Sequence, residues 1–217
     1  MVHGWDERQQ RTRNEVLDAV GALIAEGGVE FLTMRRLAER AGVAVATLYN
    51  QFGDREGVIV AYVGRGLDDL EQRLDAEPAD DPIDATRAVF EALDATIGAD
   101  PRVWQPVFAM IRSEADLEGL GAVGDRFAAI VEHDLAKASV DGRFVDIDAG
   151  RVLDTEELAW HLLGQRLRVL ERWAVGAITW AEYTEIGRLG LELSLAALLR
   201  GDERIAALRR SGVTRAQ

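Results

Sequence analysis

The sequence has 217 residues, enough for one large domain or for a small domain joined to a medium one. Hydrophobic residues make up 48% and charged residues 29%, an ordinary balance for a soluble globular protein. The net charge of −13 argues against a general binder of nucleic acid or of anionic membranes, and the absence of cysteine excludes disulfides, thiolate catalysis and Cys-based zinc sites.

The acidity is concentrated away from the start of the chain. Residues 1–57 carry a balance of −2, and the other 160 residues carry −11. A local basic face near the N-terminus is therefore compatible with the overall charge. No apolar run approaches the roughly 18 residues of a membrane span, and the first residues resemble no secretion signal, so we expect a cytoplasmic protein.

Helical spacing of apolar residues and well-placed breakers predict four helices in the first part of the chain. These helices are expected over residues 8–27, 34–41, 44–51 and 54–76. Thr33 and Asp54 have the side chains of N-caps, and Gly42 is expected to end the second helix. Residues 77–82, with two prolines and three acids, are typical of a linker.

The rest of the chain predicts further helices and no strand. They are expected over 83–97, from Asp100-Pro101 through at least 111, over 120–138, after Asp154 to 174, and from Thr179 to 199. Residues 139–153 show the least regular pattern. The prediction is an all-α fold.

Residues 34–53 fit a helix-turn-helix. Two short helices that cross closely need a small residue at the crossing, which Ala38 supplies. The turn needs a residue tolerant of positive φ, which Gly42 supplies. The second helix needs an apolar anchor, which Leu48 supplies. Alone, this spacing is only moderately specific, because many helical hairpins share it.

A longer stretch is more specific. Residues 23–43 read LIAEGGVEFLTMRRLAERAGV, and residues 47–56 read TLYNQFGDRE. In order and spacing, residues 11–65 resemble the DNA-binding domain of the TetR family of transcriptional regulators. The resemblance implies a three-helix DNA-binding domain over 1–55 and a larger helical effector-binding and dimerisation domain over 56–217, connected by the helix over 54–76.

The resemblance also assigns residues to DNA. Thr33 would cap its helix and donate to a phosphate, Arg35 would reach a base edge or phosphate, and Thr47, Tyr49 and Arg55 would contact phosphates. Exposed residues of the next helix would read bases, since Asn and Gln pair with adenine and small apolar groups touch thymine methyls. The expected DNA-binding residues are Thr33, Arg35, Arg36, Val45, Thr47, Tyr49, Asn50, Gln51 and Arg55.

The sequence departs from the family pattern at Ala44 and Val45, where members often have a hydroxyl residue and then Lys or Arg. Fewer polar side chains leave fewer direct hydrogen bonds to bases, so methyl contacts and DNA shape would matter more. The arginines at 8, 11 and 13 could compensate by reaching phosphates or a minor groove. They could equally belong to a solvated, mobile N-terminus.

In the second domain, aromatic residues are the candidates for an effector cavity between helices. The expected ligand-binding residues are Trp104, Phe108, Phe127, Trp160 and His161. Core packing is the alternative role for most of them. The resemblance implies a homodimer through the last two long helices, where Gly187, Gly190 and Ser194 could allow close approach. Such a dimer predicts a palindromic operator.

Other motifs carry less weight. Residues 119–124 read GLGAVG, but a dinucleotide site needs a preceding strand and none is predicted. Residues 146–157 partly mimic a calcium loop, yet Arg151 stands where that loop needs glycine. His133 and His161 are isolated in sequence, and no serine lies in a hydrolase motif. We therefore expect no metal, no cofactor and no enzymatic activity.

The prediction is a repressor released from its double-stranded DNA operator by a small, largely apolar effector. Two alternatives remain. One is an all-α enzyme or small-molecule carrier, which would need a catalytic or cofactor motif. The other is an interaction protein whose helix-turn-helix no longer binds DNA, which the apolar residues 44–46 keep open.

Overall fold

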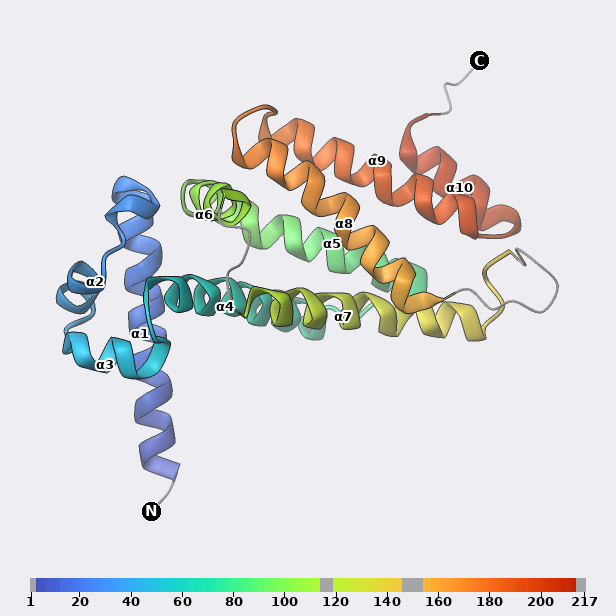
Figure 1. Cartoon of the computed structure of the whole chain (residues 1–217). Helices are drawn as coiled ribbons and strands as arrows, with labels where there is room; N and C mark the ends of the chain where they lie inside the picture. The colour runs from blue at the N-terminus through green and yellow to red at the C-terminus, as the bar shows by residue number, and fades with distance from the viewer. Residues whose placement is uncertain (1–2, 114–118, 146–153, 214–217) are drawn as a thin grey trace. The chain divides into compact units, whose positions relative to one another are not determined.

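The computed structural model describes residues 3–113, 119–145 and 154–213. Within these ranges the chain forms ten α-helices and one 3₁₀ helix, and its only β-type pairing is an isolated bridge between Phe144 and Leu199. Figure 1 shows the helices in chain order. The all-α prediction is confirmed. None of the described helices is long and apolar enough to cross a membrane.

The chain divides into two compact units, residues 1–68 with 99–123 and residues 69–98 with 124–217. We call them the first unit and the second unit. The first contains α1 (His3–Gly27), η1 (Val29–Phe31), α2 (Met34–Ala41), α3 (Val45–Phe52), the first part of α4 (Arg55–Ala76) and α6 (Pro101–Ser113). The second contains the rest of α4, α5 (Pro82–Ala99), α7 (Leu120–Val140), α8 (Thr155–Ala174), α9 (Trp180–Leu198) and α10 (Gly201–Ser211).

The core of the first unit is built on one stripe of α1. Its buried residues recur at helical spacing, as the sequence pattern predicts. They are Val16, Leu17, Val20, Leu23 and Ile24. The α1 helix contacts α2, η1 and α6. Burial of an aliphatic side chain stabilises the folded state by about 1.5–3 kcal/mol, so this stripe fixes the small helices that follow.

Helix α6 contacts α1 and η1 in the first unit, and a glycine of α4 makes room for one of its side chains. A Cβ at Gly66 of α4 would lie 2.5 Å from the indole of Trp104. Trp104 stacks on Phe108 at 5.7 Å between ring centroids and also meets Tyr62 at 5.2 Å. Residues 56–68 and α6 belong to the same compact unit as the expected DNA-binding residues, beyond the expected domain boundary at residue 55.

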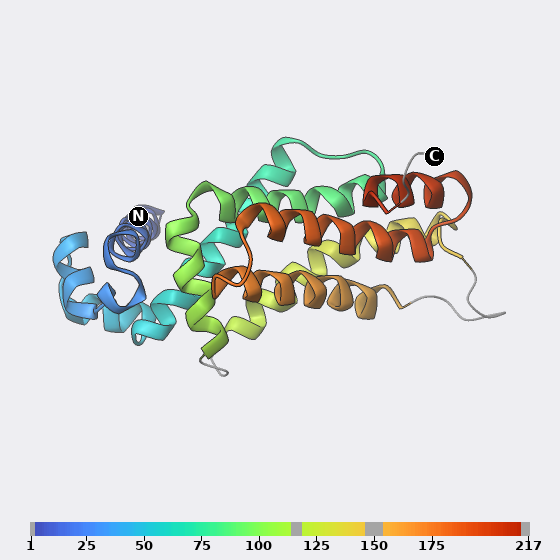
Figure 2. The same cartoon turned by 90° about the horizontal axis from the view of Figure 1, so that it is seen from above.

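The second unit packs its long helices around aromatic residues and buried polar groups. Phe90 of α5 meets Phe127 of α7 at 5.8 Å, and Trp180 and Tyr183 of α9 lie 4.7 Å apart. Figure 2 shows α9 and α10 side by side, in orange-red and red. These two helices make the most extensive helix–helix contact described.

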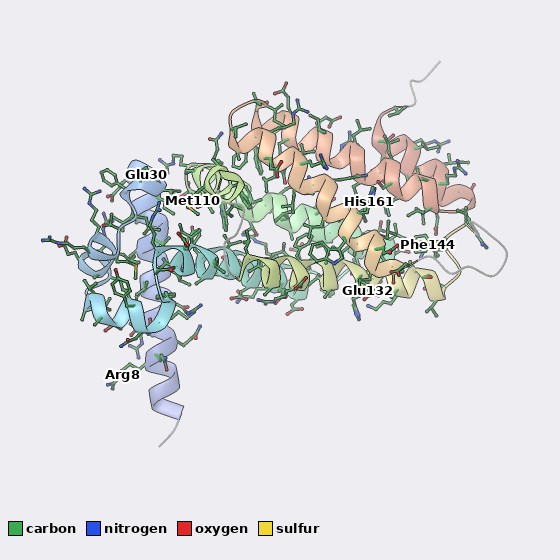
Figure 3. The ribbon with its side chains drawn as sticks, viewed as in Figure 1. Arg8, Glu30, Met110, Glu132, Phe144 and His161 are labelled. Atoms are coloured by element: carbon green, nitrogen blue, oxygen red, sulfur yellow. The ribbon has the colours of Figure 1, made fainter. Side chains whose placement is uncertain are left out.

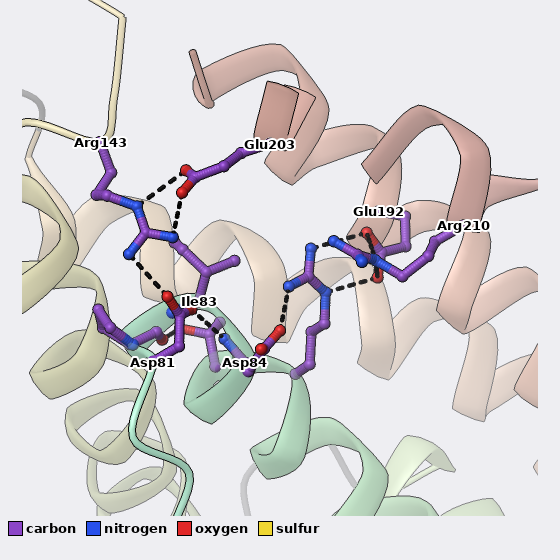
Figure 4. A network of polar contacts seen from close by, with 10 residues as sticks. Asp81, Ile83, Asp84, Arg143, Glu192, Glu203 and Arg210 are labelled. Carbon is purple, nitrogen blue, oxygen red and sulfur yellow. Dashed lines mark hydrogen bonds and ion pairs between the residues drawn. The ribbon is translucent and has the colours of Figure 1, made fainter. Parts of the chain in front are cut away.

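Ion pairs attach α10 to this unit (Figure 4). Arg143, just after α7, bonds Asp81 at 2.9 Å and Glu203 of α10 at 2.5 Å. Glu192 of α9 is buried and accepts from Arg87 at 2.8 Å and from Arg210 at 3.4 Å. We call the Asp81–Arg143–Glu203 group the α10 clasp.

Both expected caps form, since Thr33 accepts from the Arg36 N–H and Asp54 accepts from the Gly57 N–H at 2.8 Å. Asp154 also accepts from a backbone N–H three residues on, and Thr179 forms a reciprocal capping box with Glu182. Three features differ from the sequence analysis: α1 begins at His3 instead of near Arg8, η1 follows it, and α10 was not anticipated. Only Ala207 and Ser211 of α10 are buried, so its apolar stripe is too weak to be read from sequence.

Candidate functional site

The helix-turn-helix has the geometry that its sequence spacing requires. Gly42 adopts φ 67° and ψ 29°, and its N–H donates to the carbonyl of Ala38. Ala38 is 3% exposed and Leu48 is fully buried. The left-handed glycine therefore reverses the chain between α2 and α3 without a Cβ penalty, while the small alanine and the leucine anchor hold the two helices together.

The N-terminus of α2 is capped by Thr33, and the side chain of Arg35 beside it is exposed. The Thr33 hydroxyl oxygen accepts a hydrogen bond from the Arg36 N–H at 3.3 Å, which leaves the hydroxyl proton available for another acceptor. The Arg35 side chain is 86% exposed and pairs with Glu39 at 3.2 Å, one turn along. Such an exposed pair contributes little stability, so Arg35 can exchange it for a phosphate.

Helix α3 separates its inner and outer faces. Leu48 and Phe52 are buried, whereas Val45, Ala46, Tyr49 and Asn50 are exposed. The four exposed residues occupy positions i, i+1, i+4 and i+5, so they share one face. Val45 is 39% exposed and Tyr49 51%, so both side chains are accessible to a partner.

Two other residues of α3 that were expected to contact DNA are less exposed to solvent. Thr47 and Gln51 are half-buried. The Gln51 side-chain oxygen is shielded from solvent and has no hydrogen-bond partner among the described residues. An adenine contact by Gln51 therefore needs a rotation of its amide.

Several arginines of this unit already have intramolecular contacts. Arg36 lies over the Phe31 ring at 4.2 Å, and Arg13 over Phe52 at 4.9 Å. Arg55 donates to the Val29 carbonyl at 3.0 Å. Its substitution would disturb the link between α4 and η1 as well as any phosphate contact. Arg8 and Arg11 are exposed, and Figure 3 shows Arg8 projecting from the first turns of α1.

The five expected effector residues fall into different units. Trp104 and Phe108 pack in the first unit. Phe127, Trp160 and His161 belong to the second, where Phe127 is 5% exposed and Trp160 is 40% exposed. His161 is exposed and lies 2.6 Å from the Gln165 amide nitrogen on the same helix. Within a single unit, these residues do not come together as one five-membered lining.

The second unit contains a cleft that the sequence analysis missed. Its volume is about 670 Å³, and residues 71–79 of α4 and the following turn line it together with α5 and α7. Small residues open it, since its lining includes Ala79, Ala85, Ala88 and Ala129. Leu74, Val89 and Ile130 add apolar surface, whereas ionisable side chains make up much of the remaining lining, namely Glu71, Asp75, Glu77, Arg126, His133, Asp134 and Lys137. Recurring alanines on α5 and α7 were the available sequence signal, but alanine is so common in helices that it marks no cavity by itself.

Glycines of α9 make room for side chains of α8 in the same chain. A Cβ at Gly187 would lie 2.0 Å from a terminal nitrogen of Arg166, and one at Gly190 would lie 3.3 Å from the Gln165 side-chain oxygen. Ser194 also donates to that oxygen, at 3.3 Å. The three small residues thus serve the α8–α9 contact. Apolar side chains on the outer faces of these helices, such as Leu167 and Leu193, remain 40% and 38% exposed.

A buried polar group joins α5, α8 and α9. One terminal nitrogen of Arg166 donates to both oxygens of Asp94, at 3.2 and 3.1 Å, and the Tyr183 hydroxyl donates to Asp94 at 2.8 Å. Burial raises the pKa of the Asp94 carboxyl, although Arg166 and Tyr183 oppose this shift. Burial, together with the Asp94 charge, raises the pKa of Tyr183.

The remaining motifs offer no chemical site among the described residues. Gly119 lies in a turn with φ 90°, and residues 120–124 open α7. No group of histidine, cysteine and carboxylate side chains within the described ranges has the spacing of a metal site. Residues 146–153 of the calcium-loop pattern lie outside those ranges.

Comparison with known proteins adds independent information. Residues 16–62 match the model of the family described as bacterial regulatory proteins, TetR family. The chain is 32% identical over 142 residues to the HTH-type transcriptional repressor KstR of Mycolicibacterium smegmatis. The alignment covers 63% of this chain and 67% of that protein.

A second relative is the KstR repressor of Rhodococcus jostii, 29% identical over 126 residues. This match covers 56% of the chain and 59% of the relative, less than two thirds of its length. Among solved structures, SmeT, the repressor of the Stenotrophomonas maltophilia multidrug efflux pump SmeDEF, aligns with a TM-score of 0.66 and 26% identity. That alignment covers 90% of this chain and 94% of SmeT.

Proposed function

Because this chain belongs to the TetR family of bacterial regulatory proteins, we propose that it is a ligand-responsive transcriptional repressor. It binds a palindromic operator as a homodimer and leaves the DNA when a small, largely apolar effector binds. The observation that carries the proposal is the exposed face of α3, Val45, Ala46, Tyr49 and Asn50, next to the capped N-terminus of α2.

The roles on DNA follow from residue chemistry. Thr33 and Arg35 hold phosphates and fix the position of the domain, together with Tyr49. Asn50 reads adenine through its amide, and Val45 contacts a thymine methyl. Arg36, Thr47, Gln51 and Arg55 remain candidate contacts. Of these four, Arg36 already lies over the Phe31 ring and Arg55 donates to the Val29 carbonyl.

The dimer uses α8 and α9. Support comes from large apolar side chains on these helices that remain partly exposed in the single chain, including Trp160, Leu167 and Leu193. A second copy that covers them would bury apolar surface that a monomer would leave exposed to solvent. A two-fold dimer places its recognition helices about 34–36 Å apart, or a multiple of that distance, which is why the operator should be palindromic.

The effector shifts the population between DNA-competent and DNA-incompetent states, with a coupling free energy of about 1–3 kcal/mol. We assign it to the cleft between α4, α5 and α7, because that cleft is hollow and partly apolar. Phe127, Trp160 and His161 are the alternative lining. Ala129→Trp would fill the cleft, whereas Trp160→Ala would test the alternative. Effector-induced release from DNA should be lost only in the first variant.

The test of the function is selection of bound sequences from a random DNA pool at moderate salt. A recovered palindrome supports the repressor. Recovery of nothing from folded, dimeric protein favours the interaction protein with an inactive helix-turn-helix. With the selected DNA, Tyr49→Phe should weaken binding to all sequences, whereas Asn50→Ala should change the preferred base. Glu157→Ala, on α8 of the second unit, is the control that should change neither.

A further inference from the structure

The N-terminal part of α1 extends beyond the core of the first unit. The buried stripe of α1 begins at Val16, whereas the four consecutive residues 8–11 are all exposed. Four residues span a little more than one turn of an α-helix, so no side of the helix is covered there. Figure 1 shows α1 continuing past α3 toward the N-terminus. We call residues 8–11 the α1 extension.

Local chemistry keeps the α1 extension helical and beside α3. Arginine and glutamine, its two residue types, are strong helix formers, and the Thr12 hydroxyl donates to the Arg8 carbonyl at 3.0 Å. Just after the extension, the Arg13 guanidinium lies 4.9 Å from the ring centroid of Phe52, the last residue of α3. This contact fixes the extension next to the C-terminal end of the helix whose exposed face is assigned to the bases.

The α1 extension carries two unpaired positive charges. Arg8 and Arg11 are exposed, and their side chains form no ion pair or hydrogen bond with a residue that the structure describes. They are three residues apart, so their Cβ atoms lie on neighbouring turns at about 5–6 Å. Figure 3 shows Arg8 extending to the side of α1 on which α2 and α3 are seen. The acids Asp6 and Glu7 precede this pair in the sequence, so the pair acts through its position and not through a basic segment.

The helical conformation decides between the two DNA contacts that the sequence left open for these arginines. An α-helix with its side chains is about 10–12 Å wide, whereas the minor groove of B-DNA is about 6 Å wide. The extension therefore cannot enter that groove as an extended arm would. With α3 in the major groove, a helix fixed to the end of α3 meets the phosphates that border the groove, and exposed guanidinium groups bind phosphates through charge-assisted hydrogen bonds.

We propose that the α1 extension is a second DNA-binding element, in which Arg8 and Arg11 each bind a backbone phosphate beside the bases that α3 reads. The inference rests on the proposed function, since it takes DNA as the partner. These contacts add affinity without sequence preference, which offsets the small number of polar side chains on the exposed face of α3.

The salt dependence of operator binding counts the phosphate contacts. In a dimer, Arg8→Gln removes two of them and should lower the slope of log K against log salt by about 1.8, since each contact contributes about 0.9. The double variant R8Q/R11Q should lower it by about twice that amount. Arg204→Gln, which removes an exposed arginine of α10, is the matched control and should leave the slope unchanged. A wild-type slope in the double variant would overturn the proposal.

Lysine variants test the kind of contact. A phosphate accepts a point charge, so R8K/R11K should keep a slope close to that of the wild type. A slope as low as that of R8Q/R11Q would mean that the planar guanidinium reads a base edge, which contradicts the phosphate assignment. Thermal unfolding should be the same in all these variants, because both side chains are exposed and unpaired among the described residues.

Neutral methylphosphonates, placed one at a time in the selected operator, locate the phosphates. The wild-type chain should bind more weakly when a phosphate held by Arg8 or Arg11 is neutralised, and R8Q/R11Q should lose this sensitivity at those positions only. Equal sensitivity of the two proteins at every position would show that the extension touches no phosphate.

The same measurements separate this inference from the proposed function. A palindrome that the double variant binds with the wild-type slope refutes only the α1 extension as a DNA-binding element. Binding to random DNA that depends on Arg8 and Arg11, with no palindrome recovered, refutes only the operator. A wild-type chain that is folded and binds no DNA refutes both.

Discussion

The two units keep their polar groups in opposite places. In the first, the described core is apolar and charged side chains lie at or near the surface, several of them arginines stacked on aromatic rings. In the second, polar and charged groups enter the core. The buried polar residues among the described ones are Thr86, Thr96, Arg166, Glu192 and Ser211, all in this unit.

This difference in the placement of polar groups indicates which interactions determine the structure of each unit. A small apolar core tolerates any charge arrangement outside it, so the first unit can present its polar surface to a partner. A core that contains ion pairs requires each charge to find its partner, because an unpaired buried charge is expensive. The second unit is therefore specified as much by pairing as by burial.

The largest expected effect comes from breaking a buried pair. Arg166→Met leaves the Asp94 carboxyl without its cation and should lower the free energy of unfolding by about 3–5 kcal/mol. Urea unfolding followed by circular dichroism measures it. Arg35→Met, which removes an exposed pair in the first unit, is the control and should change little. If both variants lowered the free energy of unfolding by a similar amount, the proposed difference between the two units would be wrong.

A cavity in the first unit should come next. Leu48 is fully buried between the two short helices, so Leu48→Ala should cost about 3 kcal/mol through lost burial and the remaining void. Thermal unfolding and operator binding report the change. A stable variant with normal DNA affinity would show that the apolar core does not hold the recognition helix.

A backbone effect should be smaller. Gly42→Ala forces an alanine to φ 67° and should destabilise the first unit by about 1 kcal/mol. Gly64→Ala is the matched control in α4, where an added Cβ meets nothing within 4 Å. That variant should be neutral or stabilising by up to about 1 kcal/mol, as denaturant midpoints would show. Equal destabilisation by Gly64→Ala would mean that the positive φ of Gly42 is not the source of its effect.

The smallest expected effect is the pH dependence of stability that the α10 clasp contributes. Desolvation raises the pKa of the Asp81 carboxyl, but hydrogen bonds from Arg143 and two backbone N–H groups outweigh it, so the pKa is lowered from 3.8. The stabilisation is therefore present above about pH 3.8 and lost as pH falls through the lowered pKa. Because Asp81 is 39% exposed, the contribution should stay below about 1 kcal/mol.

Asp81→Asn should remove this acid-dependent part of stability, and Asp80→Asn, its exposed neighbour, should not. Urea midpoints measured between pH 2 and 6 separate the two variants. Asp94 has the opposite sign, since its raised pKa makes its contribution favourable at low pH and lost as pH rises through that value. A parallel pH dependence for both variants would exclude the clasp as its source.

What could be predicted from the sequence follows the same division. The caps at Thr33 and Asp54, the turn at Gly42 and the anchor Leu48 are local features, and each was predictable from neighbouring residues. The Asp94–Arg166 pair joins residues 72 apart and Arg87–Glu192 joins residues 105 apart, and no local pattern announces them. The aromatic pattern suggested one effector lining, yet Trp104 packs against Gly66 and Tyr62 in the first unit, whereas Phe127 packs in the second.

The α10 clasp also has a consequence for biosynthesis. Arg143 and Asp81 are made 60 residues or more before Glu203 reaches them. During translation at about 5–20 residues per second, several seconds pass after Asp81 and Arg143 have been synthesised before Glu203 is added to the chain. Contacts of high sequence separation also slow folding. The helix-turn-helix, closed by contacts within its first 60 residues, can form while the rest of the chain is still emerging.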